Sequence, residues 1–579
     1  METAQTSITQ APTLTRGDTF VGWLCILPVL LSVLAAAPFA EMGVHDDWSY
    51  IYSAKIFAET GHIAYNGWAA FPLGWLLFAG ALFIRVFGFS FTTVRSVDVI
   101  IGCLSVPLVH ALFRRLGLSR RTSVAATLTL VLCPLFLALT ASFMSDIPSL
   151  FCMLLCLYGC VRAMQARTDR AACAWLMTAA IGNLAGGTVR QIAWLGVLTM
   201  VPATAFFLRR RRGVFATGMA AFALSVLMIA AILHWFNHQP YVAIEPLLPT
   251  EFSRRGLWLI VKVGFRAACT MVLVLSPLLF ALAMGYPIRD RRARRALLAI
   301  LSVIALVIVL LSSRHGGVRW LTMLTGDYLS AKGILDLPWF YVPAPDVLPR
   351  WVQALFTAFA FSTAATCLLL WSREKRDWRH VRTAIRGPLF FLLGPFTAAY
   401  LLLVMTRAAV FDRYFLPVLF VLILLLLRWM ERRRDQPISV AWVLPLVALT
   451  AYGVAGMHDL FALTRARLMA ADELRSAGVP RTAFQAGFEY DAWTQLEKTG
   501  HVNEPRMRTP AGAYQPWTKP ANVSDECVLW FSNYTPSIHP EYVLSNRPGT
   551  CYPVADMPPV HYRTWFAPRE HTIYIERLK

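Results

Sequence analysis

The residues best suited to chemistry in this chain lie in one segment, His45-Asp46-Asp47-Trp48-Ser49-Tyr50, just beyond its first uncharged apolar run, Phe20 to Ala40. An apolar run of this length spans a bilayer as a helix. The two carboxylates are therefore expected at a membrane–water boundary, where ionised groups are less costly than in the bilayer. One Asp can be explained as a helix cap that accepts orphan backbone N–H groups. A cap does not explain two carboxylates flanked by a His and a Tyr, so the segment is a candidate site for acid–base chemistry.

Further polar groups recur where later apolar runs end: Asp146, Arg190, Arg407, Asp412, Arg413 and Tyr414. Charges at membrane edges are costly and tend to be functional. Simpler explanations exist, because Asp146 before Pro148 makes a good helix start and Arg190 can snorkel to lipid headgroups. Arg95 and Asp98, three positions apart in one apolar run, are expected to neutralise each other. Together, however, several carboxylates and arginines around one vestibule predict a site that handles an anion.

The acidic residues also suit a metal ion. Asp46, Asp47 and Asp146 are tentative ligands for a divalent cation, which prefers hard oxygen donors. His45 and His62 are weaker candidates as ligands. This cation is the only cofactor that the sequence suggests.

Composition indicates a membrane protein. The 579 residues are 57% hydrophobic and 15% charged, with a mean hydropathy of +0.53, and uncharged runs near twenty residues recur. The net charge of +21 does not indicate nucleic acid, because 41 of the 54 Lys and Arg residues lie before His458, mostly in short clusters between apolar runs. We expect a multi-pass protein of the inner (plasma) membrane. Cys527 and Cys551 fall beyond His458, where an oxidising compartment would let them pair.

The basic clusters fix the expected topology, which is mainly α-helical with about thirteen transmembrane helices. The expected spans are 20–40, 96–113, 122–141, 146–163, 171–188, 191–208, 214–235, 257–284, 296–313, 351–371, 388–406, 413–428 and 438–457. With a cytoplasmic tail at 1–19, every basic cluster is cytoplasmic and the candidate site lies outside. The apolar stretch 71–87 is expected to be an interfacial or re-entrant helix, because counting it as a span would place Arg114 and Arg115 outside.

The domain organisation follows from these spans. Residues 20–457 form a transmembrane domain, whose first outer loop, 41–95, holds the acidic motif and the interfacial helix. A second outer loop, 314–350, is expected to be a substrate lid, because long loops without structure are uncommon unless they are functional or disordered. From 458 to 579 the hydropathy falls. A helix over 459–477, followed by short apolar runs, predicts a small extracytoplasmic α/β domain.

The order of these motifs resembles that of the GT-C membrane glycosyltransferases, in the bacterial branch related to protein O-mannosyltransferases and aminoarabinose (lipid A) transferases. An acidic pair follows the first helix, an Asp-x-Pro follows the third, and an Arg-Tyr-x-x-Pro stands at 413–417. The aminoarabinose type carries a Glu-Lys-Pro-Pro-like segment in the first loop. Here that segment reads Ala69-Ala70-Phe71-Pro72, which weakens lipid A as the acceptor.

The resemblance implies roles for individual residues. Asp46 matches the catalytic carboxylate, Asp47 replaces a Glu, and Tyr50 matches the Tyr of the same motif. Asp146 matches the second acidic position. The expected donor-phosphate residues are Arg190, Arg413 and Tyr414, and weaker substrate contacts are expected from Tyr50, His62 and Arg407.

The implied activity is inverting transfer of a hexose or pentose from a polyprenyl-phosphate donor to a lipid, glycan or protein acceptor on the outer face, with Asp46 as general base. Arginine forks suit the leaving phosphate. A transporter or flippase of a lipid-linked or anionic substrate is the alternative. Transporters place substrate groups near the bilayer midplane, whereas the midplane segments here are nearly free of charge. A sensory or scaffold protein is a third class, for which thirteen spans are excessive. The sequence leaves the sugar, the acceptor and the oligomeric state open.

Overall fold

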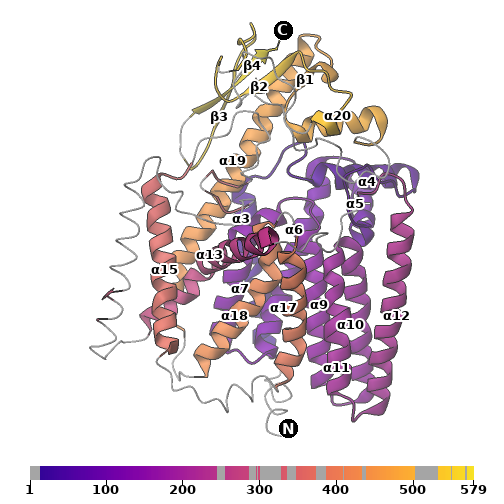
Figure 1. Ribbon diagram of the computed structural model, residues 1–579, viewed down its shortest axis with the longest axis vertical. Coiled ribbons are helices and arrows are strands. Elements are labelled where there is room, and N and C mark those ends of the chain that lie inside the picture. The colour runs from indigo at the N-terminus through magenta and orange to yellow at the C-terminus, as the bar shows by residue number, and fades with distance from the viewer. Residues whose placement is uncertain are drawn as a thin grey trace.

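The computed structural model shows a long bundle of helices with a short interfacial layer and a small β-sheet at one end (Figure 1). It describes residues 14–243, 254–285, 295, 298–299, 328–330, 332–334, 347–372, 387–407, 410–432, 438–502, 532–549, 551–566 and 570–578. The helices of the bundle, in chain order, are α2 (Arg16–Leu24), α3 (Ile26–Ala36), α6 (Phe91–Arg115), α7 (Arg120–Val131), α8 (Pro134–Thr140), α9 (Asp146–Gln165), α10 (Asp169–Val189), α11 (Val201–Phe207), α12 (Arg212–Asn237), α13 (Arg254–Met284), α15 (Arg350–Ser372), α17 (Pro388–Met405), α18 (Leu416–Glu431) and α19 (Val443–Ser476).

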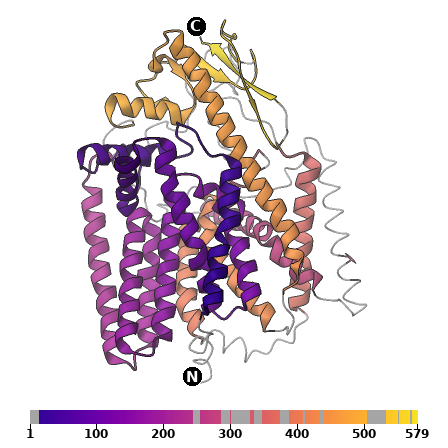
Figure 2. The ribbon, with the colours of Figure 1, turned by 180° about the vertical axis from the view of Figure 1, so that it is seen from behind.

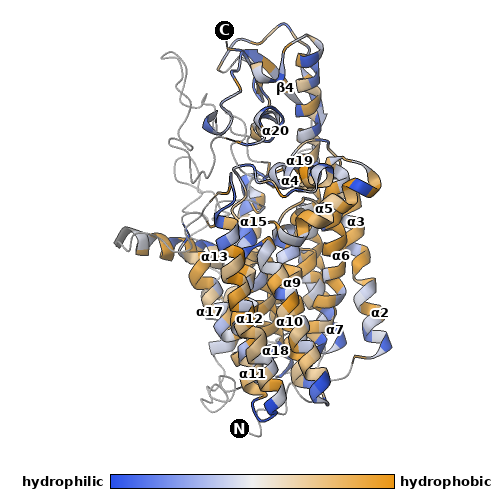
Figure 3. Ribbon diagram, turned by 90° about the vertical axis from the view of Figure 1, so that its right-hand side faces the viewer, coloured by the Kyte–Doolittle hydropathy of each residue, from blue (hydrophilic) through white to orange (hydrophobic). Residues whose placement is uncertain are grey.

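The bundle has the composition of a multi-pass membrane protein. Ten of the described helical segments are long and apolar enough to cross a membrane, and α7 with α8, bent by 62°, would make an eleventh. Hydrophobic residues cover the bundle, while hydrophilic residues gather at the helix ends and in the C-terminal part (Figure 3). Large apolar side chains such as Leu31 and Leu227 are 64% and 67% exposed, as lipid-facing positions require.

Several of the thirteen expected spans differ from this description. The expected span 296–313 lies almost wholly outside the described residues. The expected span 191–208 is a shorter apolar helix, Gln191–Phe207, broken into the 3₁₀ turn η1 (Gln191–Trp194), the π-helical η2 (Gly196–Met200) and α11. At the break, the side-chain oxygen of Asn183 on α10 accepts the backbone N–H of Val197 at 2.6 Å.

The layer between the helical bundle and the C-terminal sheet contains α4 (Asp47–Thr60) and α5 (Gly74–Phe87) (Figure 1). α5 is too short to span the membrane, in agreement with the interfacial helix expected at 71–87. It docks closely on the end of α10, because a Cβ on Gly74 would lie 1.8 Å from Thr188 Oγ1. Only glycine fits this contact. Arg190 follows Thr188 by two residues. The docking of α5 on Thr188 therefore also helps to fix the position of Arg190.

The largest departure from the expected fold is α19. A span at 438–457 and a separate helix at 459–477 were expected, but the structure has one uninterrupted helix of 34 residues, Val443–Ser476. It rises from the bundle into the sheet (Figure 2). Polar residues after His458 end the apolar run but do not end the helix, because they are good helix formers. The helix stops where Gly478 takes a left-handed backbone conformation, with φ +84°.

The C-terminal module, residues 477–578, packs α20 (Phe488–Thr499) near a four-stranded sheet of order β1-β2-β4-β3. The strands are β1 (Phe484–Gln485), β2 (Tyr542–Ser545), β3 (Val560–Arg563) and β4 (Glu570–Arg577), with β1 and β2 parallel and the other pairs antiparallel. Leu474, Leu544 and Ile573 belong to its own buried core, which includes the end of α19. Cys551 is disulfide-bonded, and Cys527, the partner considered from the sequence, lies outside the described residues.

Candidate active site

Asp46 lies at the N-cap position of α4, but its side chain makes no capping hydrogen bond. Its Oδ1 instead accepts the indole N–H of Trp68 at 3.1 Å, and its Oδ2 lies 3.0 Å from His45 Nδ1. His45 holds a left-handed backbone conformation, with φ +62°, which is uncommon for a residue with a side chain. The chain thus turns sharply before α4 and directs Asp46 away from the helix end.

Arg413 approaches Asp46 from a distant part of the sequence. It lies in η3 (Asp412–Phe415), and its Nη1 is 2.9 Å from His45 Nε2, while its Nη2 is 3.8 Å from Asp46 Oδ2. Burial acts to raise the pKa of Asp46, but His45, Arg413 and the Trp68 N–H together lower it to about 2. Asp46 is therefore ionised at any working pH.

Asp47 faces the opposite way from its neighbour. It is fully buried, pairs with Arg95 Nε at 2.7 Å, and accepts the backbone N–H of Val44 at 2.7 Å. The expected pairing of Arg95 with Asp98 is wrong, because Asp98 accepts the backbone N–H of Met144 at 2.9 Å instead. Arg95 also donates to the carbonyls of Ala40 and Met42, so this ion pair closes the turn between α3 and α4.

Asp146 and Arg190 form the second ion pair of the site. Arg190 Nη1 lies 2.5 Å from Asp146 Oδ1 and 3.3 Å from Ser145 Oγ. The other carboxylate oxygen of Asp146 is buried and has no hydrogen-bond partner among the described residues. Burial acts to lower the pKa of Arg190, but the neighbouring Asp146 raises it above its ordinary value. The guanidinium therefore stays charged although it is largely enclosed.

Tyr414 joins the two ion pairs. Its ring centroid lies 4.7 Å from the guanidinium carbon of Arg190, 5.6 Å from that of Arg413 and 5.8 Å from that of Arg407. The Tyr414 backbone is held in turn, since its carbonyl accepts the Tyr400 hydroxyl at 2.7 Å. Three arginines from two distant segments of the chain thus converge on one aromatic ring.

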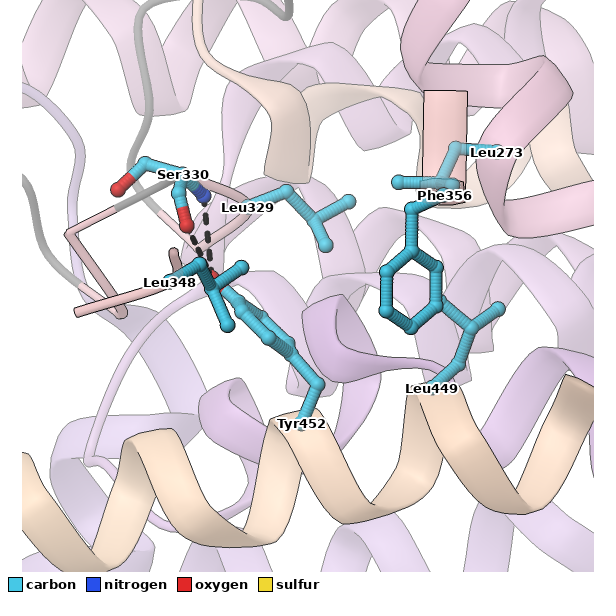
Figure 4. A pocket seen from close by; sticks show the side chains of 7 residues that line it. All are labelled: Leu273, Leu329, Ser330, Leu348, Phe356, Leu449 and Tyr452. Atoms are coloured by element: carbon cyan, nitrogen blue, oxygen red, sulfur yellow. Dashed lines mark hydrogen bonds between the residues drawn. The ribbon is translucent and has the colours of Figure 1, made fainter. Parts of the chain in front are cut away.

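A described piece of the second outer loop borders this cluster. Asp412 Oδ2 accepts the backbone N–H groups of Tyr328 and Leu329 at 3.0 and 2.9 Å, and the Tyr328 ring stacks on His45 with centroids 6.0 Å apart. Beyond Leu329 lies a small apolar hollow, where the Tyr452 hydroxyl binds the backbone of Ser330 (Figure 4). Most of the expected lid, 314–350, lies outside the described residues.

Of the two remaining candidate residues, Tyr50 is buried close to the charged cluster, whereas His62 is exposed and lies apart from it. Tyr50 is buried on α4, and burial together with the nearby charge of Asp46 raises its pKa well above the ordinary value. His62 lies exposed in the turn after α4, and the described contacts do not link it to the charged cluster. For a metal ion, the described residues contain no group of three or more His, Cys, Asp or Glu side chains arranged to hold one. Asp47, the third suggested ligand, is occupied by Arg95.

Trp68, Ser145 and Tyr400 contact the site but were not singled out from the sequence. Neither an apolar indole in a loop nor a serine next to an Asp has a distinctive pattern. His45 was considered as part of the acidic segment and as a weak metal ligand, but not as a partner of Arg413. Its position between a carboxylate and Arg413, 368 residues later, depends on the tertiary fold.

The fold and the site define a polytopic membrane protein that gathers two carboxylate–arginine pairs at one end of its helical bundle. Residues 72–236 match the family described as dolichyl-phosphate-mannose-protein mannosyltransferase. This match confirms the resemblance to the GT-C membrane glycosyltransferases. No individual curated protein matches the chain.

Several solved structures are similar to this chain, among them the following three. ArnT from Cupriavidus metallidurans in the apo state is 13% identical, with 96% of this chain and 98% of that chain covered at a TM-score of 0.39. The same enzyme bound to undecaprenyl phosphate is 13% identical, with 95% and 97% covered at 0.39. The Archaeoglobus fulgidus oligosaccharyltransferase in the apo form is 15% identical, with 90% and 69% covered at 0.40. Superpositions at these scores do not align individual side chains.

Proposed function

We propose that this protein is an inverting glycosyltransferase that moves a sugar from a polyprenyl-phosphate donor to an acceptor hydroxyl on the extracytoplasmic face of the inner membrane. Arg190, Arg413 and Arg407 bind the donor phosphate, and Asp46 is the general base. The family that matches residues 72–236 is named for dolichyl-phosphate-mannose, which is a sugar on a polyprenyl phosphate. That name supports a lipid-linked donor.

The observation that carries the proposal is the convergence of three guanidinium groups on Tyr414. Arginine presents a planar fork of N–H donors that matches phosphate oxygens, and such contacts are strongest where water is scarce. Arg413 is only 6% exposed. A small apolar hollow lies beside Leu329, whose backbone N–H donates to Asp412, the residue before Arg413.

The chemistry follows from this arrangement. The bond between the anomeric carbon and the phosphate oxygen breaks, and the phosphate leaves with both bonding electrons while the arginines stabilise its growing charge. The acceptor oxygen attacks the opposite face of the anomeric carbon, and its proton passes to Asp46. A single displacement inverts the configuration. With a pKa of about 2, Asp46 is a weak base that is always ionised, so it also stabilises positive charge on the sugar ring.

Asp47 has a structural role in this proposal, because its carboxylate is used by Arg95 and the backbone of Val44. A divalent cation at the site would have only Asp46 and Asp146 as carboxylate ligands among the described residues. No step of the proposed reaction passes through a metal. Transfer is therefore expected to continue after treatment with EDTA, and loss of transfer that Mg²⁺ or Mn²⁺ restores would contradict this part of the proposal.

The test is transfer from a synthetic short-chain polyprenyl-phosphate sugar in detergent, with hydrolysed or transferred sugar measured by mass spectrometry. A glycosyltransferase releases polyprenyl phosphate with inverted product and needs no membrane. A transporter leaves the donor intact in detergent and moves it only across sealed proteoliposomes. Donor movement without bond cleavage would overturn the proposal and support the transporter class.

The side of the membrane is tested by cysteine labelling of single positions. Lys498 in α20 and Arg121 at the start of α7 are both exposed. α20 lies above the helical bundle (Figure 3), whereas the start of α7 packs on Asp18 of α2 at the other end of the bundle. An impermeant maleimide should label Lys498→Cys in intact cells and should label Arg121→Cys only after lysis. The reverse pattern would place the site on the cytoplasmic face.

A further inference from the structure

Trp68 links Asp46 to the C-terminal module. Its Nε1–H donates to Asp46 Oδ1 at 3.1 Å. Its ring lies 5.1 Å from Phe488 and 5.1 Å from Tyr534, both in the C-terminal module, and 5.4 Å from the buried Trp48 of α4. Tilted and edge-on ring pairs at these distances are favourable contacts. Two of the three rings that surround Trp68 thus come from a part of the chain outside the helical bundle.

The segment that carries Trp68 is itself fastened to the same module. The carbonyl of Asn66 accepts the backbone N–H of Val502 at 2.8 Å, and a Cβ on Gly67 would lie 2.5 Å from the carbonyl oxygen of Val502. Gly67 also has φ +91°, so it is required for both conformation and space. The Asn66 side chain binds Ser49 on α4. Residues 66 to 68 are therefore clamped between α4 and the C-terminal module.

The hydrogen bond from Trp68 affects how Asp46 can turn. Oδ1 is held by the indole and Oδ2 by His45, while Arg413 remains 3.8 Å away. A carboxylate released from the indole could rotate towards Arg413 and form a closer, charge-assisted pair. In such a pair, Asp46 would be less able to accept the proton of the acceptor, and Arg413 would be less able to bind the donor phosphate.

We propose that Trp68 is a positioning residue for Asp46, and that Phe488 and Tyr534 of the C-terminal module hold Trp68 in place. The module thereby sets the orientation of the general base. This inference rests on the proposed function of Asp46. It assigns the C-terminal module a part in the transfer step, through the chain of contacts from Phe488 to Trp68 to Asp46.

The decisive variant is Trp68→Phe, which keeps an aromatic ring in the cluster but removes the N–H. Donor binding sites are first counted with a short-chain polyprenyl phosphate, so that turnover is expressed per binding-competent molecule. We expect kcat per site to fall about tenfold, the scale of one lost hydrogen bond to a charged group, with the donor KM changed less than twofold. A packing role alone would lower the melting temperature or the number of sites and leave kcat per site unchanged, which would overturn the inference.

A double-mutant cycle tests whether Trp68 acts through Asp46. In an Asp46→Asn background, Trp68→Phe should cause no further loss, because the group that it positions is gone. Additive losses would overturn the inference. Phe488→Leu should lower kcat per site in the same direction and less than additively with Trp68→Phe. The matched control is Tyr52→Phe, which removes a hydrogen bond between α4 and α20 that does not involve Trp68 and should leave kcat per site unchanged.

The two levels of proposal fail in different ways. If wild-type protein transfers no sugar, or if Asp46→Asn keeps full activity, the proposed function is wrong. If wild-type protein is active and Asp46→Asn is not, while Trp68→Phe and Phe488→Leu both show wild-type kcat per site, only the role of Trp68 and the C-terminal module is wrong.

Discussion

Carboxylates meet arginines at both ends of the helical bundle, but the two clusters differ in how completely the charges are satisfied. At one end, Asp18 of α2 is fully buried and accepts hydrogen bonds on both oxygens, from Arg114, Arg120 and the N–H and hydroxyl of Thr15. At the other end, Asp146 has one oxygen on Arg190 and one without a partner among the described residues.

This difference separates a structural ion pair from a candidate binding site. The Asp18 cluster fixes the start of α2 against α6 and α7, and nothing remains for a ligand to bind. At the other cluster, a buried carboxylate oxygen without a partner is costly. Such a cost is tolerated where a substrate group or an acceptor hydroxyl completes the hydrogen bonding. Asp18 and Asp146 are both buried, but the first stabilises the fold and the second is a candidate for binding substrate.

The largest effect should come from the base. Asp46→Asn keeps the size of the side chain and removes its charge, so transfer should fall by about two to four orders of magnitude. The melting temperature should fall as well, since the ionised Asp46 pairs with His45, but less than in Asp47→Asn, because Asp46 lies 3.8 Å from Arg413 whereas Asp47 lies 2.7 Å from Arg95. Transfer is measured from the synthetic donor, per donor-binding site. Full activity in this variant would remove Asp46 from the reaction.

The two structural carboxylates should show the opposite pattern. Asp47→Asn leaves the buried Arg95 uncompensated and should destabilise the protein by up to about 3–5 kcal/mol. Asp18→Asn should destabilise it less, because Arg114 and Arg120 are 12% and 50% exposed. The loss is measured as a lower melting temperature in detergent, and kcat per donor-binding site should stay near that of the wild type. A stable Asp47→Asn protein without activity would show that Asp47, not Asp46, is the reacting group.

The arginines of the candidate site should tolerate less change than those of the Asp18 cluster. Arg190→Ala or Arg413→Ala should cost about 2–4 kcal/mol of transition-state stabilisation and weaken donor binding. Lysine at either position should also lower activity, though less, because an ammonium cannot reproduce the planar fork. Arg120→Lys is the matched control, since that side chain is half exposed and contacts Asp18. Wild-type rates in Arg190→Lys and Arg413→Lys would argue against a bound phosphate.

The smallest effect expected is that of pH. The pKa of Asp46 is about 2, below the ordinary value of about 3.9, so its ionised form is favoured in the folded protein. The stabilisation is fully present above about pH 4 and is lost as the pH falls towards 2. The kcat/KM of transfer should therefore show no loss from Asp46 between about pH 8 and 5. An acid limb in this range that shifts in Asp46→Glu would contradict the assignment.

The main features of the fold could be predicted from the sequence, and several of the residues selected from it lie close together in the structure. Apolar runs predicted most helices, because hydrophobic length is a direct requirement of the bilayer. The sequence also predicted that 71–87 is not a full span, and the structure has a helix there, Gly74–Phe87, of only 14 residues. Residues at the ends of distant runs, such as Asp146, Arg190 and Arg413, were selected because charges there are expensive.

The sequence was insufficient where partners are distant or where two patterns look alike. Asp46 and Asp47 have the same chemistry, and only the turn at His45 shows which one faces Arg413 and which faces Arg95. Arg95 and Asp98 have the spacing of a helical ion pair, but tertiary contacts give each another partner. The continuity of α19 was missed because hydropathy marks where a helix leaves the apolar region, not where it ends.

The bond between Tyr52 and the carbonyl of Leu496 joins residues 444 positions apart in the sequence. At about 5–20 residues per second, the ribosome needs roughly 20 to 90 s to produce the second partner after the first. The acidic segment is therefore among the first parts of the chain to enter the membrane and among the last to acquire its final neighbours. If Trp68 orients Asp46 as we propose, the side chain of Asp46 is not held in its active orientation during most of synthesis. The protein would then gain full activity only when translation is nearly complete.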